Sequence, residues 1–198
     1  MTIKTQKKVE KRTVDITNLQ TRAEQDGEKH VISGYASVFN SRTIIGDDWW
    51  TEEIAPGAFS ETIGKDNDIR ALFNHDWNNV LGRTKAGTLK LEEDDHGLRF
   101  EVELPNTSVA RDLVESLKRG DINQCSFGFI PTAEEWDYSV EPAHRTITKV
   151  ELFEVSVVSI PAYEDTEVSL VRSKEIANSV EKRMKLIKKI NQVLGDKK

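Results

Sequence analysis

The stretch Asn123–Ile130, NQCSFGFI, is the part of the chain around which the rest is organised. In an extended strand successive side chains point to opposite faces. One face is apolar and is expected to lie in the core: Cys125, Phe127 and Phe129. The other face is smaller and more polar: Gln124, Ser126, Gly128 and Ile130. We expect open space above the Ser126 hydroxyl, which needs an adjacent base before it can act as a nucleophile.

Length and composition indicate one globular domain with appendages. The chain has 198 residues, 37% hydrophobic and 31% charged, which suffices for a core. No apolar run approaches the length of a membrane span, and no signal-peptide block opens the chain. Cys125 is the single cysteine, so no intramolecular disulfide forms and a reducing cytoplasm is expected. The four histidines lack metal-ligand spacing, and we assign neither a metal nor a cofactor.

Charge is distributed unevenly along the chain, although the net charge is only -6. Residues 1–13 hold five basic side chains and one acidic, and residues 172–198 hold nine basic and three acidic. The middle, residues 14–171, keeps 14 basic against 30 acidic side chains. An acidic body argues against a nucleic-acid-binding domain. Nucleic acid is therefore an unlikely partner, except through the basic ends.

The pattern of apolar residues predicts a mainly β domain with flanking helices. Residues 1–12 are expected to be a disordered basic segment, and the domain is expected to span residues 13–171. Alternation and turn residues predict the strands Thr13–Thr17, His30–Phe39 with a bulge near Gly34, Ile69–His75, Gly87–Leu91, Gly97–Leu104, Asp121–Ile130 and Arg145–Ile160. The connections are expected to include Gln20–Lys29 and Ser41–Trp50, and Ala133–Ala143 is expected to be a hairpin loop or an excursion.

Three helices are expected. Proline at a first turn predicts a short helix over Pro56–Ile63, and a four-residue apolar repeat predicts a longer one over Pro105–Gly120. Apolar residues at alternating spacings of four and three predict a basic amphipathic helix within residues 172–198. The adjacent Trp49 and Trp50 are expected in the core.

Two further residues could complete the chemistry of Ser126. His75 shares a face with Ile69, Ala71 and Phe73 and is expected to end a strand on its apolar side. Glu154 is expected to share a buried face of a central strand with Leu152 and Ser156. A buried carboxylate needs a partner, and a histidine would serve. A nucleophile, a base and an acid that orients the base are the components of acyl-transfer hydrolysis.

Several short motifs, in order, resemble the prohead (capsid maturation) serine proteases of tailed phages, which are related in fold to the herpesvirus assemblin proteases. The resemblance covers about residues 12–171 and rests on Gly34–Ala36, Ile54–Phe59, Asn74–Asp76, Leu81–Thr84, Cys125–Phe129, Glu154–Val158 and Pro161–Tyr163.

This resemblance implies a compact, mostly antiparallel barrel with flanking helices. It implies Ser126 as nucleophile, His75 as general base and Glu154 as the third member. The implied substrates are the scaffold region and extensions of the major capsid protein, and the protease's own ends. The implied location is the immature capsid in the cytoplasm of the host bacterium. Related assemblin proteases act as dimers, so a homodimer is one possible state.

Alternatives within the site stay open at this point. Cys125 is a rival nucleophile, but alternation directs it into the core. Glu151 is a rival acid on the opposite face of its strand, and Asp76 is too close to His75 in sequence to orient its ring well. The oxyanion hole has two candidates, a backbone N–H at Gly128 and the side chain of Arg83.

A function of another class is also compatible with the sequence. A non-catalytic assembly or scaffold protein could keep the protease barrel and use the heptad-like tail for interaction. Labelling of Ser126 by a fluorophosphonate would separate the two hypotheses, because only the protease needs an activated serine.

Overall fold

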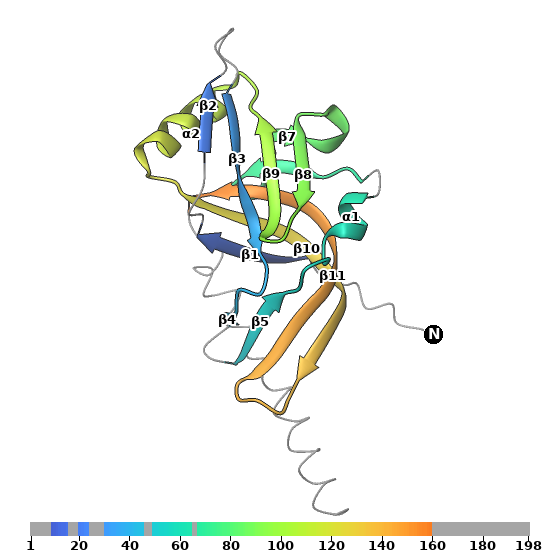
Figure 1. The fold of residues 1–198 in the computed structure, drawn as a ribbon. Coiled ribbons are helices and arrows are strands. Elements are labelled where there is room, and N and C mark those ends of the chain that lie inside the picture. The colour runs from blue at the N-terminus through green and yellow to red at the C-terminus, as the bar shows by residue number, and fades with distance from the viewer. Residues whose placement is uncertain (1–8, 16–19, 24–29, 46–48, 65–66, 160–198) are drawn as a thin grey trace, which may run out of the picture.

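The computed structural model describes residues 9–15, 20–23, 30–45, 49–64 and 67–159, which form two β-sheets with short helices at their margins (Figure 1). The helix expected within residues 172–198 and the domain boundary after residue 171 lie outside the described residues. Neither of the described α-helices is long and apolar enough to cross a membrane.

The larger sheet has seven strands, hydrogen-bonded in the order β1-β10-β11-β5-β4, with β6 and β7 attached beside β11. Their bounds are β1 Glu10–Asp15, β4 Thr43–Ile45, β5 Trp50–Ile54, β6 Arg70–Phe73, β7 Asp76–Arg83, β10 Gln124–Asp137 and β11 Ala143–Val158. Strand β11 pairs with β10 on one side and with β5 and β6 on the other. The prediction of a central strand there is confirmed.

The smaller sheet has four strands in the order β2-β3-β9-β8, all antiparallel. Their bounds are β2 Gln20–Ala23, β3 His30–Val38, β8 Leu89–Glu93 and β9 Gly97–Glu103. The predicted hairpin of β8 and β9 is confirmed. The pairing register of β3 with β9 shifts between Tyr35 and Ser37. The bulge expected near Gly34 is therefore present, one to three residues after that glycine.

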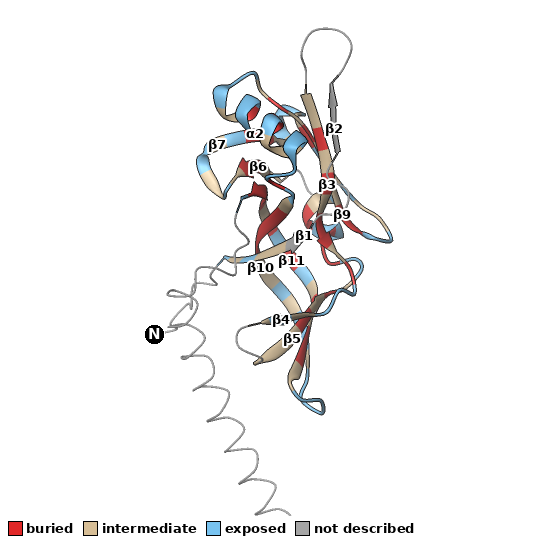
Figure 2. Ribbon diagram, turned by 90° about the vertical axis from the view of Figure 1, so that its left-hand side faces the viewer, coloured by how far each residue is buried: buried red, intermediate tan, exposed pale blue. Residues whose placement is uncertain are grey.

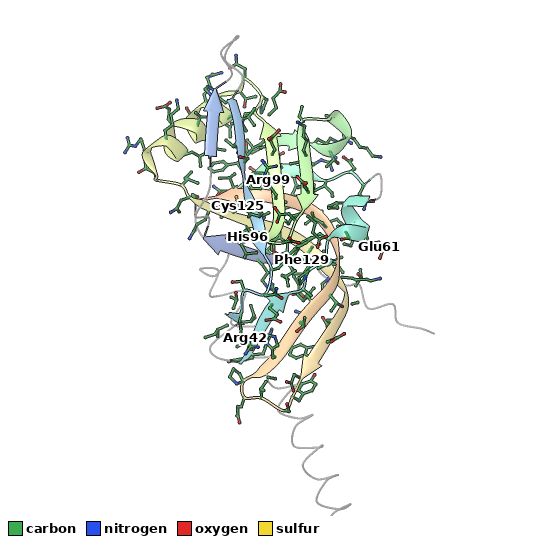
Figure 3. All side chains as sticks on the ribbon, viewed as in Figure 1. Arg42, Glu61, His96, Arg99, Cys125 and Phe129 are labelled. Atoms are coloured by element: carbon green, nitrogen blue, oxygen red, sulfur yellow. The ribbon has the colours of Figure 1, made fainter. Side chains whose placement is uncertain are left out.

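The two sheets enclose one core, which Figure 2 shows as the buried central part of the ribbon. Phe127 and Phe129 stack 4.9 Å apart, and Phe127 meets Phe59 edge-on at 5.5 Å. Figure 3 labels Cys125 and Phe129 on β10, in this central region. The fold is mainly β and mostly antiparallel, as expected. The described strands hydrogen-bond into two sheets rather than one closed barrel.

The helices lie beside the sheets. Helix α1 covers Ser60–Gly64, later than the expected Pro56–Ile63, because residues 56–59 form turns. A single 3-10 turn covers Thr84–Ala86. Helix α2 covers Ser108–Arg119 and confirms the prediction: Thr107 caps its start through a bond from Ala110 N, and Gly120 ends it in the left-handed conformation.

Three expectations for the polar segments are wrong. Glu10–Arg12 belong to β1 rather than to a disordered segment, because Arg12 binds the buried carboxylate of Glu52. Strand β2 lies within the expected connection Gln20–Lys29, and β4 within the expected loop Ser41–Trp50.

The hairpin expected over Ala133–Ala143 is present, but its loop is shorter than expected, because β10 continues to Asp137 and β11 begins at Ala143. The two strands form a long hairpin that projects from the body (Figure 1). Side chains hold this projection together. Trp136 contacts Trp50 edge-on at 6.0 Å and stacks on Tyr138 at 5.7 Å. Trp49 and Trp50 are half-buried, so the expected core location is wrong for both.

Candidate active site

Four residues form a compact group on one face of the β10–β11 ladder. Ser126 lies directly opposite Ser156, and Gly128 lies directly opposite Glu154. Opposed residues of an antiparallel pair share a face, as do residues two apart in one strand. Ser126 therefore lies on the same face as Glu154, and the core residues Phe127 and Val155 lie behind them.

A register shift between Gly128 and Phe129 changes one expected face. The pairing moves from Gly128–Glu154 to Phe129–Leu152, so β11 has one extra residue there. Leu152 thus lies with the core residue Phe129 and not with Glu154. The expectation that Leu152 and Glu154 share a face is wrong, because simple alternation does not continue through a bulge.

The absence of a side chain at Gly128 makes room for the Glu154 carboxylate. A Cβ atom at Gly128 would lie 2.4 Å from Glu154 Oε1, far inside van der Waals contact. The glycine is therefore needed for space at the site.

Glu154 is 3% exposed, and both of its oxygens accept hydrogen bonds. Oε1 lies 2.7 Å from His75 Nδ1, and Oε2 accepts from Ser156 Oγ at 2.5 Å. An ionised carboxylate is only an acceptor, so the contact assigns a proton to Nδ1 and leaves Nε2 as the basic nitrogen. The structure thus brings together His75 and Glu154, as the sequence predicted.

His75 lies in a tight turn rather than at the end of a strand. Strand β6 ends at Phe73 and β7 begins at Asp76, with Asn74 and His75 between them at φ 54° and 57°. The expectation that His75 ends a strand is wrong. Left-handed backbone at two successive residues reverses the chain.

Asn74 connects this turn to the end of β11. Its backbone N donates to Val157 O at 2.9 Å. Its side-chain Oδ1 accepts from Ser159 N at 2.8 Å and from Ser159 Oγ at 3.1 Å. These bonds hold the turn against the strand that carries Glu154. They therefore also fix the position of the His75 backbone, from which the imidazole extends.

Ser126 is 0% exposed, so the expected open space above its hydroxyl is not present. Within the part of the chain that the structure describes, Ser126 Oγ and His75 Nε2 are both buried without a hydrogen-bond partner. The imidazole of His75 and the hydroxyl of Ser126 are therefore not hydrogen-bonded to each other in this structure.

The competing site residues lie in unsuitable places. Cys125 is buried, and burial raises the pKa of its thiol well above the usual value, which disfavours the reactive thiolate. Glu151 is exposed. The carboxylate of Asp76 accepts from Asn78 and Asn79 at 2.9 Å, and none of its described contacts reaches the His75 ring.

Neither oxyanion candidate is brought to Ser126 by a contact among the described residues. Gly128 lies in a strand paired on both sides, with Lys11 and Glu154 as its partners. The Arg83 guanidinium binds Asp68 through two bonds of 2.5 and 2.6 Å. The bonds from Arg83 lower the pKa of Asp68 to about 2.

Sequence reasoning did not assign a role to Ser156 or Asn74. For Ser156 the only sequence signal is its position two residues after Glu154, since residues two apart in a strand share a face. Nothing in the sequence marked the side-chain contact of Asn74 with Ser159. Within the described ranges no group of three or more His, Cys, Asp and Glu side chains could hold a metal ion.

Comparisons with known proteins show the family of this chain. The model of the caudovirus prohead serine protease family matches residues 17–182. The prohead protease of Enterobacteria phage HK97 is 30% identical over 166 residues, which cover 82% of this chain and 69% of that protein. The prohead protease of Escherichia phage T5 is 32% identical over 102 residues, 52% of this chain and 45% of that protein.

The fold has a solved counterpart. The structure of the bacteriophage T4 capsid assembly protease, gp21, aligns with a TM-score of 0.50 at 9% identity, over 77% of this chain and 98% of that one. The family model that matches the chain describes a class of serine proteases. More particularly, the chain belongs to the family of caudovirus prohead serine proteases.

Proposed function

We propose that this chain is a serine endopeptidase that cleaves the scaffold region and the extensions of the major capsid protein during prohead maturation. In this proposal Ser126 is the nucleophile, His75 the general base and Glu154 the acid that orients the base. One observation carries it: the buried Glu154 holds His75 Nδ1 at 2.7 Å on the sheet face that also carries Ser126.

The first half of the reaction forms an acyl-enzyme. Ser126 Oγ attacks the scissile carbonyl, and its proton passes to His75 Nε2. The imidazolium that results faces the Glu154 carboxylate through Nδ1–H, so the new positive charge is stabilised in a site with little water. The C–N bond then breaks, and the leaving amine takes the proton from Nε2.

The second half hydrolyses the acyl-enzyme. His75 Nε2 removes a proton from water as the water attacks the ester carbonyl, and it returns that proton to Ser126 Oγ. Since Oγ and Nε2 are not bonded in the structure, substrate binding must bring them into hydrogen-bond range, as catalytic contacts often tighten only in the Michaelis complex.

The oxyanion donors stay a prediction. Arg83 would serve only after its guanidinium leaves Asp68, because that carboxylate now occupies it. The backbone N–H of Gly128 would serve only after leaving the strand ladder.

Family membership supports the rest of the proposal. The enzyme acts inside the immature capsid, in the cytoplasm of the host bacterium, on capsid and scaffold proteins, and it also removes its own ends. The proposal includes a homodimer, by analogy with the related assemblin proteases.

Mass spectrometry of full-length wild type and Ser126→Ala, each with the major capsid protein and its scaffold region, tests the proposal. Wild type is expected to produce new termini in the capsid protein and in itself, and Ser126→Ala is expected to produce none. Processing by Ser126→Ala at the wild-type rate would overturn the assignment of the nucleophile.

The burial of Ser126 Oγ without a bond from His75 favours one second candidate, a non-catalytic assembly protein that keeps the protease fold. Fluorophosphonate labelling separates the candidates. Labelling of Ser126 that depends on His75 supports the protease. A complete lack of labelling, both of the free protein and inside assembled particles, supports the assembly protein.

A further inference from the structure

We propose that Ser156 is a positioning residue for this site. Its hydroxyl holds one carboxylate oxygen of Glu154, so that the other oxygen faces His75. This inference rests on the proposed function, because it assigns Ser156 a role through Glu154.

The contacts of Glu154 divide between two partners. Oε1 is bound by His75 Nδ1 at 2.7 Å, and Oε2 is bound by the Ser156 hydroxyl at 2.5 Å. Both Glu154 and Ser156 are buried, at 3% and 2% exposure. Without Ser156, Oε2 would be a buried charged oxygen that has lost the hydroxyl it accepts from, which is a costly state.

The strand geometry explains why this hydroxyl can act on the carboxylate orientation. Glu154 and Ser156 are two apart in β11 and share a face. The terminal torsion of a glutamate side chain is broad, so a carboxylate held at only one oxygen can rotate. A hydrogen bond at each oxygen fixes its plane. Gly128 on the opposite strand leaves room for this orientation, since a Cβ there would lie 2.4 Å from Oε1.

The role of Ser156 is orientation and not proton transfer. During attack the Ser126 proton goes to His75 Nε2, and Ser156 keeps its own proton as the donor to Glu154. Loss of the Ser156 hydroxyl should therefore slow acylation of Ser126 and should act through Glu154 alone.

A purely structural role would look different. Ser156 lies opposite Ser126 in the ladder, and a small buried residue there could simply fill space. Truncation would then lower the stability of the fold, and its effect on the rate would add to that of a Glu154 variant. Residues that act as one unit give non-additive effects.

The second-order rate of fluorophosphonate–rhodamine labelling of Ser126, measured on the full chain, tests the inference. The variants are Ser156→Ala, Ser156→Thr, Glu154→Gln and the double variant Glu154→Gln/Ser156→Ala. Ser37→Ala is the matched control, since Ser37 is also 2% exposed but lies in the other sheet. Circular dichroism melting shows that each variant is folded.

Ser156→Ala is expected to lower the labelling rate about ten- to a hundredfold, the size expected for one hydrogen bond to a charged group. Ser156→Thr keeps a hydroxyl and should recover most of the rate, and Ser37→Ala should label at the wild-type rate. In the Glu154→Gln background, Ser156→Ala should cause no further loss. Should Ser156→Ala fail to fold, Ser156→Cys, a weak donor of similar size, should show the same loss.

The two proposals fail in distinguishable ways. If the wild type is labelled neither as the free protein nor inside assembled particles, or is labelled at a residue other than Ser126, the proposed function is wrong. If the wild type is labelled at Ser126 but Ser156→Ala reacts at the wild-type rate, only the role of Ser156 is overturned. Additive losses in the Glu154→Gln background would overturn that role as well.

Discussion

At the scale of single residues, Gly128 is subject to the tightest steric limit in the site. Its Cα lies across the ladder from Glu154, and the space that a side chain would need is filled by Oε1. A residue with a Cβ must displace the carboxylate that orients His75, or move the strand itself.

We therefore expect Gly128→Ala to reduce fluorophosphonate labelling of Ser126 by more than about tenfold, because the displaced carboxylate no longer meets Nδ1 at hydrogen-bond distance. Gly64→Ala is the matched control, since nothing lies within 4 Å of a Cβ built there. A wild-type labelling rate in folded Gly128→Ala would contradict this account of the glycine.

Cys125 offers a second test, because it is adjacent to Ser126 yet faces the core. Its pKa is raised by burial, so it should not react with Ellman's reagent in the native protein and should react once the protein is unfolded in guanidinium. Cys125→Ala should lose about 1–2 kcal/mol of stability through a small cavity and keep the labelling of Ser126. Loss of labelling in a folded Cys125→Ala protein would instead support Cys125 as the nucleophile.

At the scale of elements, the turn between β6 and β7 determines where His75 lies. Asn74 and His75 have positive φ, a region that asparagine tolerates better than most residues. The side-chain acceptor of Asn74 also binds the chain at Ser159, so this residue combines a backbone role with a tethering role.

Three substitutions at Asn74 separate these roles. Asn74→Asp keeps an acceptor, Asn74→Gly keeps only the backbone freedom, and Asn74→Ala keeps neither. We expect labelling rates and melting temperatures to fall in that order, with Asn74→Ala about 1–3 kcal/mol less stable than the wild type. Equal behaviour of Asn74→Gly and Asn74→Asp would show that the bond to Ser159 does not matter.

Elements with strong local signals could be predicted from sequence, whereas those that depend on distant partners could not. Helix α2 has its own cap at Thr107 and its own stop at Gly120, and β8 and β9 alternate around a short turn. The start of β1 has the composition of a basic tail, because Glu52, which binds Arg12 from another strand, is 40 residues away in sequence.

The site shows the same division. Alternation within each strand correctly places Ser126 opposite the core face of β10 and Glu154 on the same face of β11 as Ser156. The position of His75 in a left-handed turn and the extra residue in β11 depend on pairing between strands, which no local pattern encodes.

At the scale of the whole molecule, a cluster of charges attaches the first strand to the larger sheet. Arg12 binds Glu52 and Glu10, and Arg145 binds Glu52, Glu10 and Glu134. Glu52 and Arg145 are buried. Burial pushes the pKa of Glu10 upward, but Arg12 and Arg145 outweigh it, and the pKa lies below its usual value of 4.5.

A carboxyl group whose pKa is lower in the folded than in the unfolded protein stabilises the fold at pH values above its pKa in the unfolded state. That stabilisation is lost as the pH falls through its pKa in the folded state. We expect Glu10→Gln to lower stability at pH 7 by about 1 kcal/mol or less, since the carboxylate is partly exposed. The difference from wild type should shrink as the pH falls below about 4.5. Melting curves between pH 7 and pH 3 measure it, and the exposed Glu135→Gln is the control. A difference that does not depend on pH would contradict the assignment.

The place of β1 also bears on how far the amino end can be trimmed. Thr13 lies directly opposite Ser126, and β1 occupies the outer side of β10 over Gln124–Phe129. A cut before Glu10 would leave that cover intact. A cut within β1 would make β10, which carries Ser126, an edge strand with unpaired backbone groups. Any extended peptide, including another copy of the chain, could then pair with that edge.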